Sequence, residues 1–222
     1  MKKIVFIRAD SSSQIGTGHI MRCLVLAHAL KKKGHCVEFV SRPQLGDLVS
    51  FIRTKGFVVH ELRQPLDGLS PAHTADYAAW LQVSWQEDAQ NFLTLLDRAD
   101  LVVVDHYGID EDWQQDLKAY YDKLMVIDDL ADREHQCDIL LDQTFGRQQQ
   151  DYEELVPKSC ELLLGSQFAL LRPEFAKWRQ YSLERRKYPV FKQLLINMGG
   201  NDSENFTGEI LKKLKECKLP NI

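Results

Sequence analysis

The residues best suited to chemistry form a short loop near the start of the chain. The segment runs Asp10-Ser-Ser-Ser-Gln-Ile-Gly16-Thr-Gly18-His19 and joins an apolar run to a helix-like one. Two glycines let the backbone turn tightly and approach a ligand closely, and free N–H groups at a helix start attract a negative group. The dinucleotide-binding fingerprint would need glycine where Met21 stands, and the Gly-Lys-Ser/Thr of a P-loop does not occur. The loop therefore disfavours ATPases and dinucleotide oxidoreductases, although its G-x-G spacing alone is not specific.

His19 falls in the first turn of the expected helix. There the helix dipole disfavours a positive imidazolium, so we expect a neutral ring near pH 7. A neutral imidazole can accept a proton, as a general base must. From the spacing alone, a histidine that only closes the turn or bonds the backbone is an equally good interpretation.

A second polar group follows the valine-rich run at 101–104, in the order Asp105-His106-Tyr107-Gly108. The Tyr107 hydroxyl can donate to a leaving group or hold a water molecule. Asp105 can orient His19 or a sugar hydroxyl. Without further information, a plain strand-end turn with Tyr107 packed on a helix is the more frequent arrangement, because polar loop residues are common.

Acidic residues at two later strand ends raise the question of a metal site. Asp128, Asp129 and Asp142 are the carboxylates concerned, and hard cations favour grouped carboxylates. No Asp-x-Asp spacing occurs there, so we expect no metal and no cofactor. The five cysteines are odd in number and lack C-x-x-C spacing, which favours free thiols. The four tryptophans are expected to be packing residues.

Composition narrows the class of protein further. The 222 residues carry a formal charge of -4, whereas general nucleic-acid binders usually carry a basic surface. The apolar run at 4–7 is too short for a signal peptide, and no run reaches the length of a membrane span. We therefore expect a cytoplasmic protein that binds neither nucleic acid nor membrane. The oligomeric state cannot be read from the sequence.

Strand-like and helix-like segments alternate along most of the chain. The sequence predicts strands at 4–8, 37–41, 57–62, 101–104, 124–127 and 139–141, and helices at 19–33, 48–55, 75–96 and 112–121, with a break near 83–84 in the third helix. This alternation predicts an α/β fold, with a parallel sheet covered by helices on both faces. Ligands of such sheets bind beyond the carboxyl ends of the strands, which is where Asp10, Asp105 and Asp128 fall.

The pattern changes near residue 175. A charged helix at 174–187 is broken by Tyr188-Pro189, and a strand at 193–197, a Gly-Gly turn and a helix at 203–216 follow. One strand and one helix cannot bury a core. We therefore expect an N-terminal domain at 1–187 and, at 188–222, the start of a truncated second domain.

Several segments resemble a known family. RADSSSQIGTGHIMRCLVLA, VVVDHYGID, CDILLDQ, LLLGSQFALLRPEF and NMGGND occur in that order. They resemble the UDP-2,4-diacetamido-2,4,6-trideoxy-β-L-altropyranose hydrolases of pseudaminic acid biosynthesis, a pathway that serves flagellin glycosylation. GTGH followed by LVLAHAL is also similar to the start of the peptidoglycan UDP-N-acetylglucosamine transferase, which supports a glycosyltransferase-B ancestry.

The resemblance implies two Rossmann-like domains, the first holding the sugar and the second holding UDP. It also implies that 188–222 is the start of a truncated C-terminal nucleotide-binding domain, so that this chain alone would bind UDP poorly. It implies hydrolysis of a UDP-sugar by water attack at the anomeric carbon with inversion, His19 as the base, Tyr107 beside it, and no metal. The other candidate substrate contacts are Asp10, Ser13, Gln14, Gly16, Gly18, Asp105, His106, Gly199, Gly200, Asn201 and Asp202. Two alternatives remain open: a related UDP-sugar glycosyltransferase, and a sugar-binding or assembly module without catalysis.

Overall fold

A computed structural model describes residues 2–73, 75–96, 98–190, 193–199, 202 and 204–217. They belong to two compact units, Met1–Leu170 and Leu171–Ile222. The first unit contains the sheet and the loop that leads to His19, and the second contains two helices. The expected division of the complete protein into domains after residue 187 stays a prediction.

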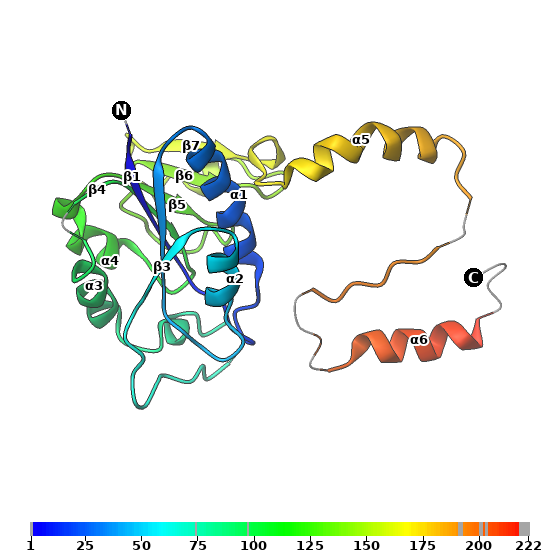
Figure 1. The fold of residues 1–222 in the computed structure, drawn as a ribbon, viewed down its shortest axis with the longest axis horizontal. Coiled ribbons are helices and arrows are strands. Elements are labelled where there is room, and N and C mark those ends of the chain that lie inside the picture. Colours follow the sequence, from blue (N-terminus) through cyan, green and yellow to red (C-terminus); the bar gives the residue numbers. More distant parts are fainter. Residues whose placement is uncertain are drawn as a thin grey trace. The chain divides into compact units, whose positions relative to one another are not determined.

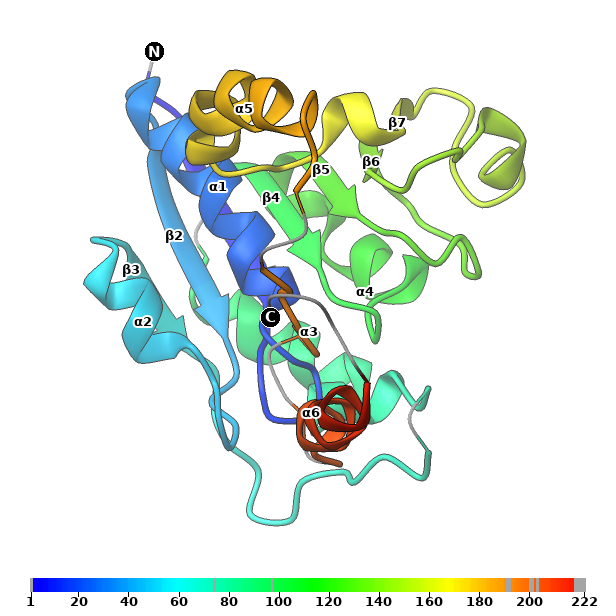
Figure 2. The same cartoon turned by 90° about the vertical axis from the view of Figure 1, so that its right-hand side faces the viewer.

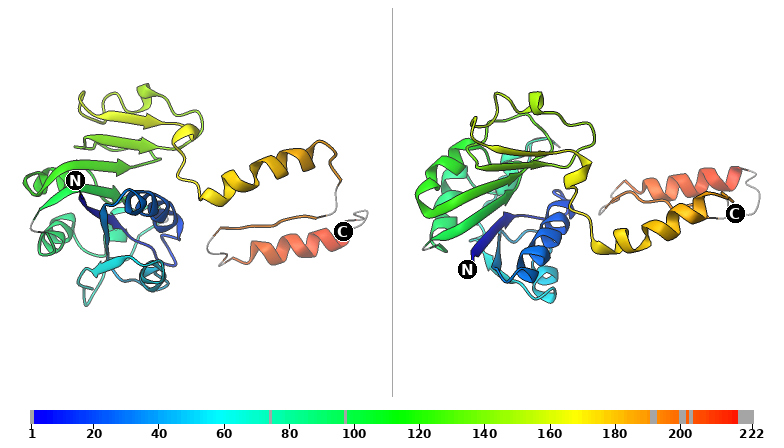
Figure 3. Two further views of the ribbon diagram at one scale, coloured as in Figure 1. Left: turned by 45° about the horizontal axis from the view of Figure 1, so that its top comes forward. Right: turned by 90° about the horizontal axis from the view of Figure 1, so that it is seen from above.

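The first unit is built on a parallel sheet with the strand order β3-β2-β1-β4-β5-β6-β7. Its strands are β1 (Ile4–Ala9), β2 (Cys36–Ser41), β3 (Val58–Glu61), β4 (Ala99–Asp105), β5 (Tyr121–Ile127), β6 (Ile139–Asp142) and β7 (Glu161–Leu164). The arrowheads in Figure 2 point toward one edge of the sheet. Six strands lie where the apolar runs predict them. β7 is not predicted, because a short leucine run fits a helix as well as a strand; it lies at the edge of the sheet beside β6 (Figure 3).

Helices cover both faces of this sheet, as the alternation predicts (Figure 1). They are α1 (Gly18–Lys32), α2 (Val49–Thr54), α3 (Trp85–Leu93) and α4 (Glu111–Asp116), with short 3₁₀ helices η1 (Ala78–Leu81), η2 (Lys118–Tyr120), η3 (Gln149–Asp151) and η4 (Ser166–Phe168). Side chains alternate along a strand, so Ile7 packs in the core beneath α1 and α2, while Phe6 packs in the core beneath α3 and α4. Both cores are apolar, and together they hold β1 and β4 at the centre.

Two expected helices are shorter in the structure. The segment 75–96 contains η1 and α3, separated by Gln82, whose φ of +65° is left-handed. The Ser84 side chain then caps α3 by accepting from the Glu87 N–H. The segment 112–121 leaves the α-helix after Asp116, and Tyr121 already belongs to β5 with a buried ring. Tertiary burial of that ring overrides the helical pattern.

The second unit contains α5 (Pro173–Arg186) and α6 (Phe206–Glu216). Proline at the first position of α5 suits a helix start, because its missing N–H would be unpaired there anyway. The strand predicted at 193–197 is wrong. No described segment pairs with these residues, and a strand is defined by its ladder partner.

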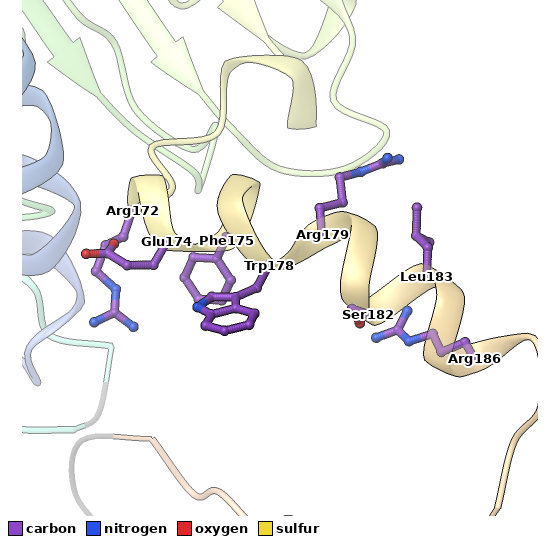
Figure 4. Close-up of a pocket in the computed structure, with 8 residues that line it drawn as sticks. All are labelled: Arg172, Glu174, Phe175, Trp178, Arg179, Ser182, Leu183 and Arg186. Carbon is purple, nitrogen blue, oxygen red and sulfur yellow. The ribbon is translucent and has the colours of Figure 1, made fainter.

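One side of α5 carries a shallow pocket of about 730 Å³ (Figure 4). Phe175 and Trp178 project next to each other there and are each more than half exposed. The expectation that Trp178 is a packing residue is therefore wrong for the described residues of this unit.

A cluster of buried ions lies at the carboxyl ends of β1 and β2. Arg8 pairs with Asp10 (2.5 Å) and with Asp88 on α3 (2.8 Å), and Arg42 also pairs with Asp88 (2.8 Å). The Trp113 indole N–H donates to Asp88 over 3.1 Å. All four charged side chains are fully buried. Burial alone would raise the pKa of Asp88, but the charges of Arg8 and Arg42 hold it below its usual range. The carboxylates therefore stay ionised and tie α3 to the sheet.

Removing Asp88 should destabilise the fold strongly. Asp88→Ala leaves two buried arginines without this carboxylate, and breaking a buried pair costs about 3–5 kcal/mol of unfolding free energy. Because the pKa of Asp88 is depressed in the folded state, its contribution is present above the unfolded value of about 3.9 and is lost as the pH falls further. Urea denaturation between pH 3 and 7 measures both effects. Asp122→Ala, at an exposed pair with Arg98, is the matched control, and an equal loss in both variants would contradict the prediction.

Candidate active site

The loop before α1 brings His19 to the carboxyl edge of the sheet. Gly16 has a φ of +79°, and its N–H donates to the Ser12 carbonyl over 2.8 Å, which closes the turn. The Ser12 hydroxyl accepts from the backbone N–H groups of Gln14 and Ile15. Helix α1 then starts at Gly18, so His19 lies in its first turn as predicted.

His19 is held by a buried carboxylate. Its Nδ1 lies 2.6 Å from Asp105 Oδ1, at the end of β4. Arg22, one helical turn further along α1, donates to both oxygens of Asp105 at 2.6 Å each. Burial by itself would raise the pKa of Asp105, but His19 and Arg22 lower it well below its usual range. An ionised carboxylate only accepts hydrogen bonds, so Nδ1 carries a hydrogen, and in the neutral ring Nε2 is then the acceptor.

The surroundings of the His19 ring are polar on one side and aromatic on the other. Only 7% of the side chain is exposed. The Tyr107 ring meets it edge-on at 4.6 Å between centroids, and the Trp80 ring lies 6.3 Å away. The ring is thus fixed by a charged pair and two aromatic neighbours, and it is not enclosed in an apolar core.

Tyr107 belongs to the same hydrogen-bonded network. Its hydroxyl donates to Asp129, which follows β5, and Arg22 Nη1 reaches the other oxygen of Asp129 at 2.7 Å. Burial first, and then the bond to Asp129, raise the pKa of Tyr107. Because its hydrogen is given to Asp129, the phenol oxygen is left as an acceptor. Of the two roles expected for Tyr107, holding a water molecule fits this arrangement better than donating to a leaving group.

Three residues of this network are not among the sequence candidates. Arg22 lies three residues after His19 and therefore on the same side of α1, which is a signal that the sequence does contain. Asp129 follows the strand next to β4, so the sheet order brings it close to Asp105. Trp80, expected only to pack, stacks on Tyr107 at 5.6 Å between centroids.

Two predicted substrate contacts, Asp10 and His106, are buried and paired within the protein. Asp10 is fully buried: besides pairing with Arg8, it lies 3.3 Å from His106 Nε2. His106 Nδ1 accepts from the Gly108 N–H over 3.0 Å, and burial lowers the pKa of His106. A Cβ at Gly108 would lie 2.4 Å from the Tyr77 carbonyl oxygen. Asp10 and His106 therefore support the two site loops, and their contact with substrate stays a prediction.

Asp105, also predicted to contact substrate, is fully buried beneath His19, whereas the other contacts predicted in the first unit are at least partly exposed. Ser13 and Gln14 line a pocket of about 570 Å³, with the Ser13 hydroxyl donating to the Leu45 carbonyl over 3.1 Å. Gly16 is half-buried and Gly18 exposed, with nothing within 4 Å of a Cβ built on either. Their contact with substrate stays a prediction.

The contacts predicted in the second unit are only partly described. The Gly199 N–H donates to the Asn197 side chain over 2.8 Å, and its φ is +83°. Asp202 accepts from the N–H groups of Phe206 (2.8 Å) and Thr207 (3.0 Å), so it caps α6. Hydrogen bonds from Thr207 lower the pKa of Asp202. Gly200 and Asn201 lie outside the described residues. Binding of UDP by this turn stays a prediction.

The other acidic residues considered for a metal are each paired with an arginine or tyrosine side chain. Asp128 pairs with Arg133 at 2.9 Å, Asp142 pairs with Arg147, and the Tyr152 hydroxyl donates to both acids. Among the described residues, no group of three or more His, Cys, Asp or Glu side chains is arranged to hold a metal ion. The expectation that no metal is needed stays a prediction.

The five cysteines are free thiols. Within the described part of the chain, no helix has the length and apolarity to cross a bilayer.

Comparison with known proteins identifies the family. The chain is 34% identical over 221 residues to the UDP-2,4-diacetamido-2,4,6-trideoxy-β-L-altropyranose hydrolase of Campylobacter jejuni, covering 98% of this chain and 68% of the relative. The chain belongs to the family of this hydrolase. It is also 25% identical over 214 residues to an uncharacterized protein of Methanocaldococcus jannaschii, covering 95% of this chain and 39% of that one. No family model matches the chain.

A solved structure bears on the fold. The structure of MurG from Acinetobacter baumannii superposes with a TM-score of 0.56 at 14% identity, covering 99% of this chain and 58% of MurG. At this identity the likeness concerns the fold alone. It confirms the glycosyltransferase-B-type Rossmann-like fold that the sequence predicts.

Proposed function

We propose that this chain forms the sugar-binding and catalytic part of a hydrolase that splits a UDP-linked 2,4-diacetamido-2,4,6-trideoxyhexose into free sugar and UDP. The proposal places it in pseudaminic acid biosynthesis. The observation that carries the proposal is the His19–Asp105 pair, which leaves Nε2 as an acceptor at the carboxyl edge of the sheet. The hydrolase name of the Campylobacter jejuni relative supports the reaction class.

The reaction needs one base and one well-placed water. In the proposed step, the water oxygen bonds to the anomeric carbon while one of its protons passes to His19 Nε2. The bond between the anomeric carbon and the diphosphate oxygen breaks, and UDP leaves with the bonding electrons from the opposite face, so the configuration inverts. A positioned base contributes about 10²–10⁴-fold to the rate, and correct placement of the water in a closed site adds more.

Tyr107, Arg22 and Asp129 position the attacking water and the His19 base relative to each other. The Tyr107 oxygen, whose hydrogen goes to Asp129, accepts from the water and turns one of its lone pairs toward the sugar. Arg22 binds Asp105 and Asp129 together, so the orientation of His19 and that of Tyr107 are coupled. We assign Arg22, Asp105 and Asp129 as positioning residues, because none of them needs to touch the reacting atoms.

The diphosphate requires a separate partner. The first-turn N–H groups of α1 suit a negative group, and the Thr17 side chain makes no capping bond to them. The chain covers 58% of MurG and 68% of the hydrolase relative. We therefore propose that uridine is bound largely by a part of the complete protein outside these 222 residues, and that activity requires that part.

His19 should control turnover rather than affinity. In the complete protein, His19→Asn removes the acceptor Nε2 base and should lower kcat by about 10²–10⁴-fold while leaving KM similar. Steady-state release of UDP measures this change. His73→Asn, at an exposed histidine outside the network, is the control. Near-normal turnover of the His19 variant would remove this residue from the chemistry.

Tyr107 should contribute less than His19. Tyr107→Phe keeps the ring against His19 and Trp80 but loses the acceptor oxygen, so about one hydrogen bond is lost and kcat should fall about tenfold. NMR of the products gives the rate and shows whether free sugar or a glycoside forms. An unchanged rate would make Tyr107 a packing residue. Transfer to an alcohol acceptor without free sugar would replace hydrolysis by the glycosyltransferase alternative.

A further inference from the structure

The pocket beside the Ser12–Gln14 loop has an unusual lining. It measures about 570 Å³, within the range of about 300–1,000 Å³ for ligand pockets. Four of its lining residues are glutamines, at Gln14, Gln44, Gln64 and Gln82. Two serines, two prolines, a leucine and a glycine complete it, and no lining residue carries a charge.

Three of these glutamines have their amide groups fixed in one orientation. Gln44 Nε2 donates to the Trp80 carbonyl (2.9 Å), Gln64 Nε2 to the Pro43 carbonyl (2.7 Å), and Gln82 Nε2 to the Leu69 carbonyl (3.0 Å). A carbonyl oxygen only accepts, so each amide must present its N–H₂ there. Each Oε1 therefore faces away from that carbonyl and is an acceptor.

A pocket with no charged residues and several fixed acceptors favours a neutral ligand that carries hydrogen-bond donors. A diphosphate is bound best by cations, and no lining residue supplies one. An acetamido N–H or a sugar hydroxyl is a neutral donor that matches the amide oxygens. The substrate class of the proposed function carries two acetamido groups, each with one N–H.

The pocket shares two segments with the His19 site. Its Ser12–Gln14 wall is part of the loop that continues into His19. The Trp80 carbonyl that anchors Gln44 belongs to the residue whose ring lies beside His19 and stacks on Tyr107. A sugar in the pocket would thus contact the loop that leads to His19 and a glutamine anchored to Trp80.

We propose that this pocket binds the acetamido-bearing part of the sugar, and that Gln44, Gln64 and Gln82 determine specificity by accepting from acetamido N–H groups. The inference rests on the proposed function, since it identifies how that site selects its substrate. The pocket is a sugar subsite and leaves the diphosphate to other residues.

The test compares two ligands that differ only in the donor. Free 2,4-diacetamido-2,4,6-trideoxyhexose and its 2,4-di-O-acetyl analogue have the same shape, but the ester lacks the N–H. Titration of the complete protein, followed by saturation-transfer NMR, should give a Kd about tenfold lower for the diacetamido sugar, with saturation on its acetyl methyl groups. This is the size expected for one or two net hydrogen bonds.

The variants Gln44→Met and Gln64→Met should abolish that preference. Each should raise the Kd of the diacetamido sugar about threefold to tenfold and leave the Kd of the ester nearly unchanged, because an ester has no donor to lose. Gln90→Met, at an exposed position of α3, is the matched control. Unfolding midpoints of all variants establish that they fold.

Two results would overturn the proposal: equal Kd values of the wild type for both ligands, or an unchanged preference in both glutamine variants. If the Gln44 variant fails to fold, Gln64 and the wild-type comparison still decide. The binding experiment does not depend on turnover. If the complete protein released no UDP, the proposed hydrolysis would be contradicted, but the two Kd values would still test the sugar subsite.

Discussion

The structure of the site depends on one fully buried carboxylate, that of Asp105. A charge removed from water must be compensated by close partners. His19 supplies one hydrogen bond and Arg22 supplies two, all at 2.6 Å. Because both partners come from α1, the carboxylate fixes the start of this helix against the end of β4. Because the Asp105 carboxylate accepts a hydrogen bond from His19, it also fixes the hydrogen on Nδ1 of that ring.

The same carboxylate connects two parts of the site that lie far apart in the sequence. Arg22 continues from Asp105 to Asp129, and Asp129 receives the Tyr107 hydroxyl. The ends of β4 and β5 are neighbours in the sheet, so this connection needs no long side chain other than the arginine. Guanidinium suits the position because its planar fork can serve two carboxylates at once. A lysine there would offer a single point charge.

Much of the fold can be predicted from the sequence because apolar runs and glycine stops mark the buried strands and the helix ends. Strands that are covered by helices on both faces are almost continuously apolar, so they are easy to recognise. The errors fall where tertiary contacts decide. Tyr121 enters the sheet because its ring is buried. The break expected near 83–84 does occur, where Gln82 has a left-handed backbone. β7 is not predicted because its short leucine run fits a helix as well as a strand.

The site is predictable where a residue type and a sheet edge coincide, as for His19, Asp105 and Tyr107. For Asp10 the substrate contact stays a prediction, and Arg8 two residues earlier indicates a second, structural role. A buried arginine in a strand needs an acid on the same face, and residues two apart share a face. Asp10 is therefore paired with Arg8 in the ion cluster. Arg22 is not predicted because helix spacing alone does not say which of its neighbours an arginine will bind.

The measurement that tests this account most directly is the tautomer of His19 in the complete protein, from ¹⁵N NMR near neutral pH. The account predicts a ring with hydrogen on Nδ1 and an unprotonated, acceptor-type Nε2. It also predicts that Asp105→Asn reverses the two nitrogens, because Arg22 would hold the amide oxygen and turn the amide N–H₂ toward Nδ1. A wild-type ring with hydrogen on Nε2, or one unchanged by Asp105→Asn, would contradict the central role of this carboxylate.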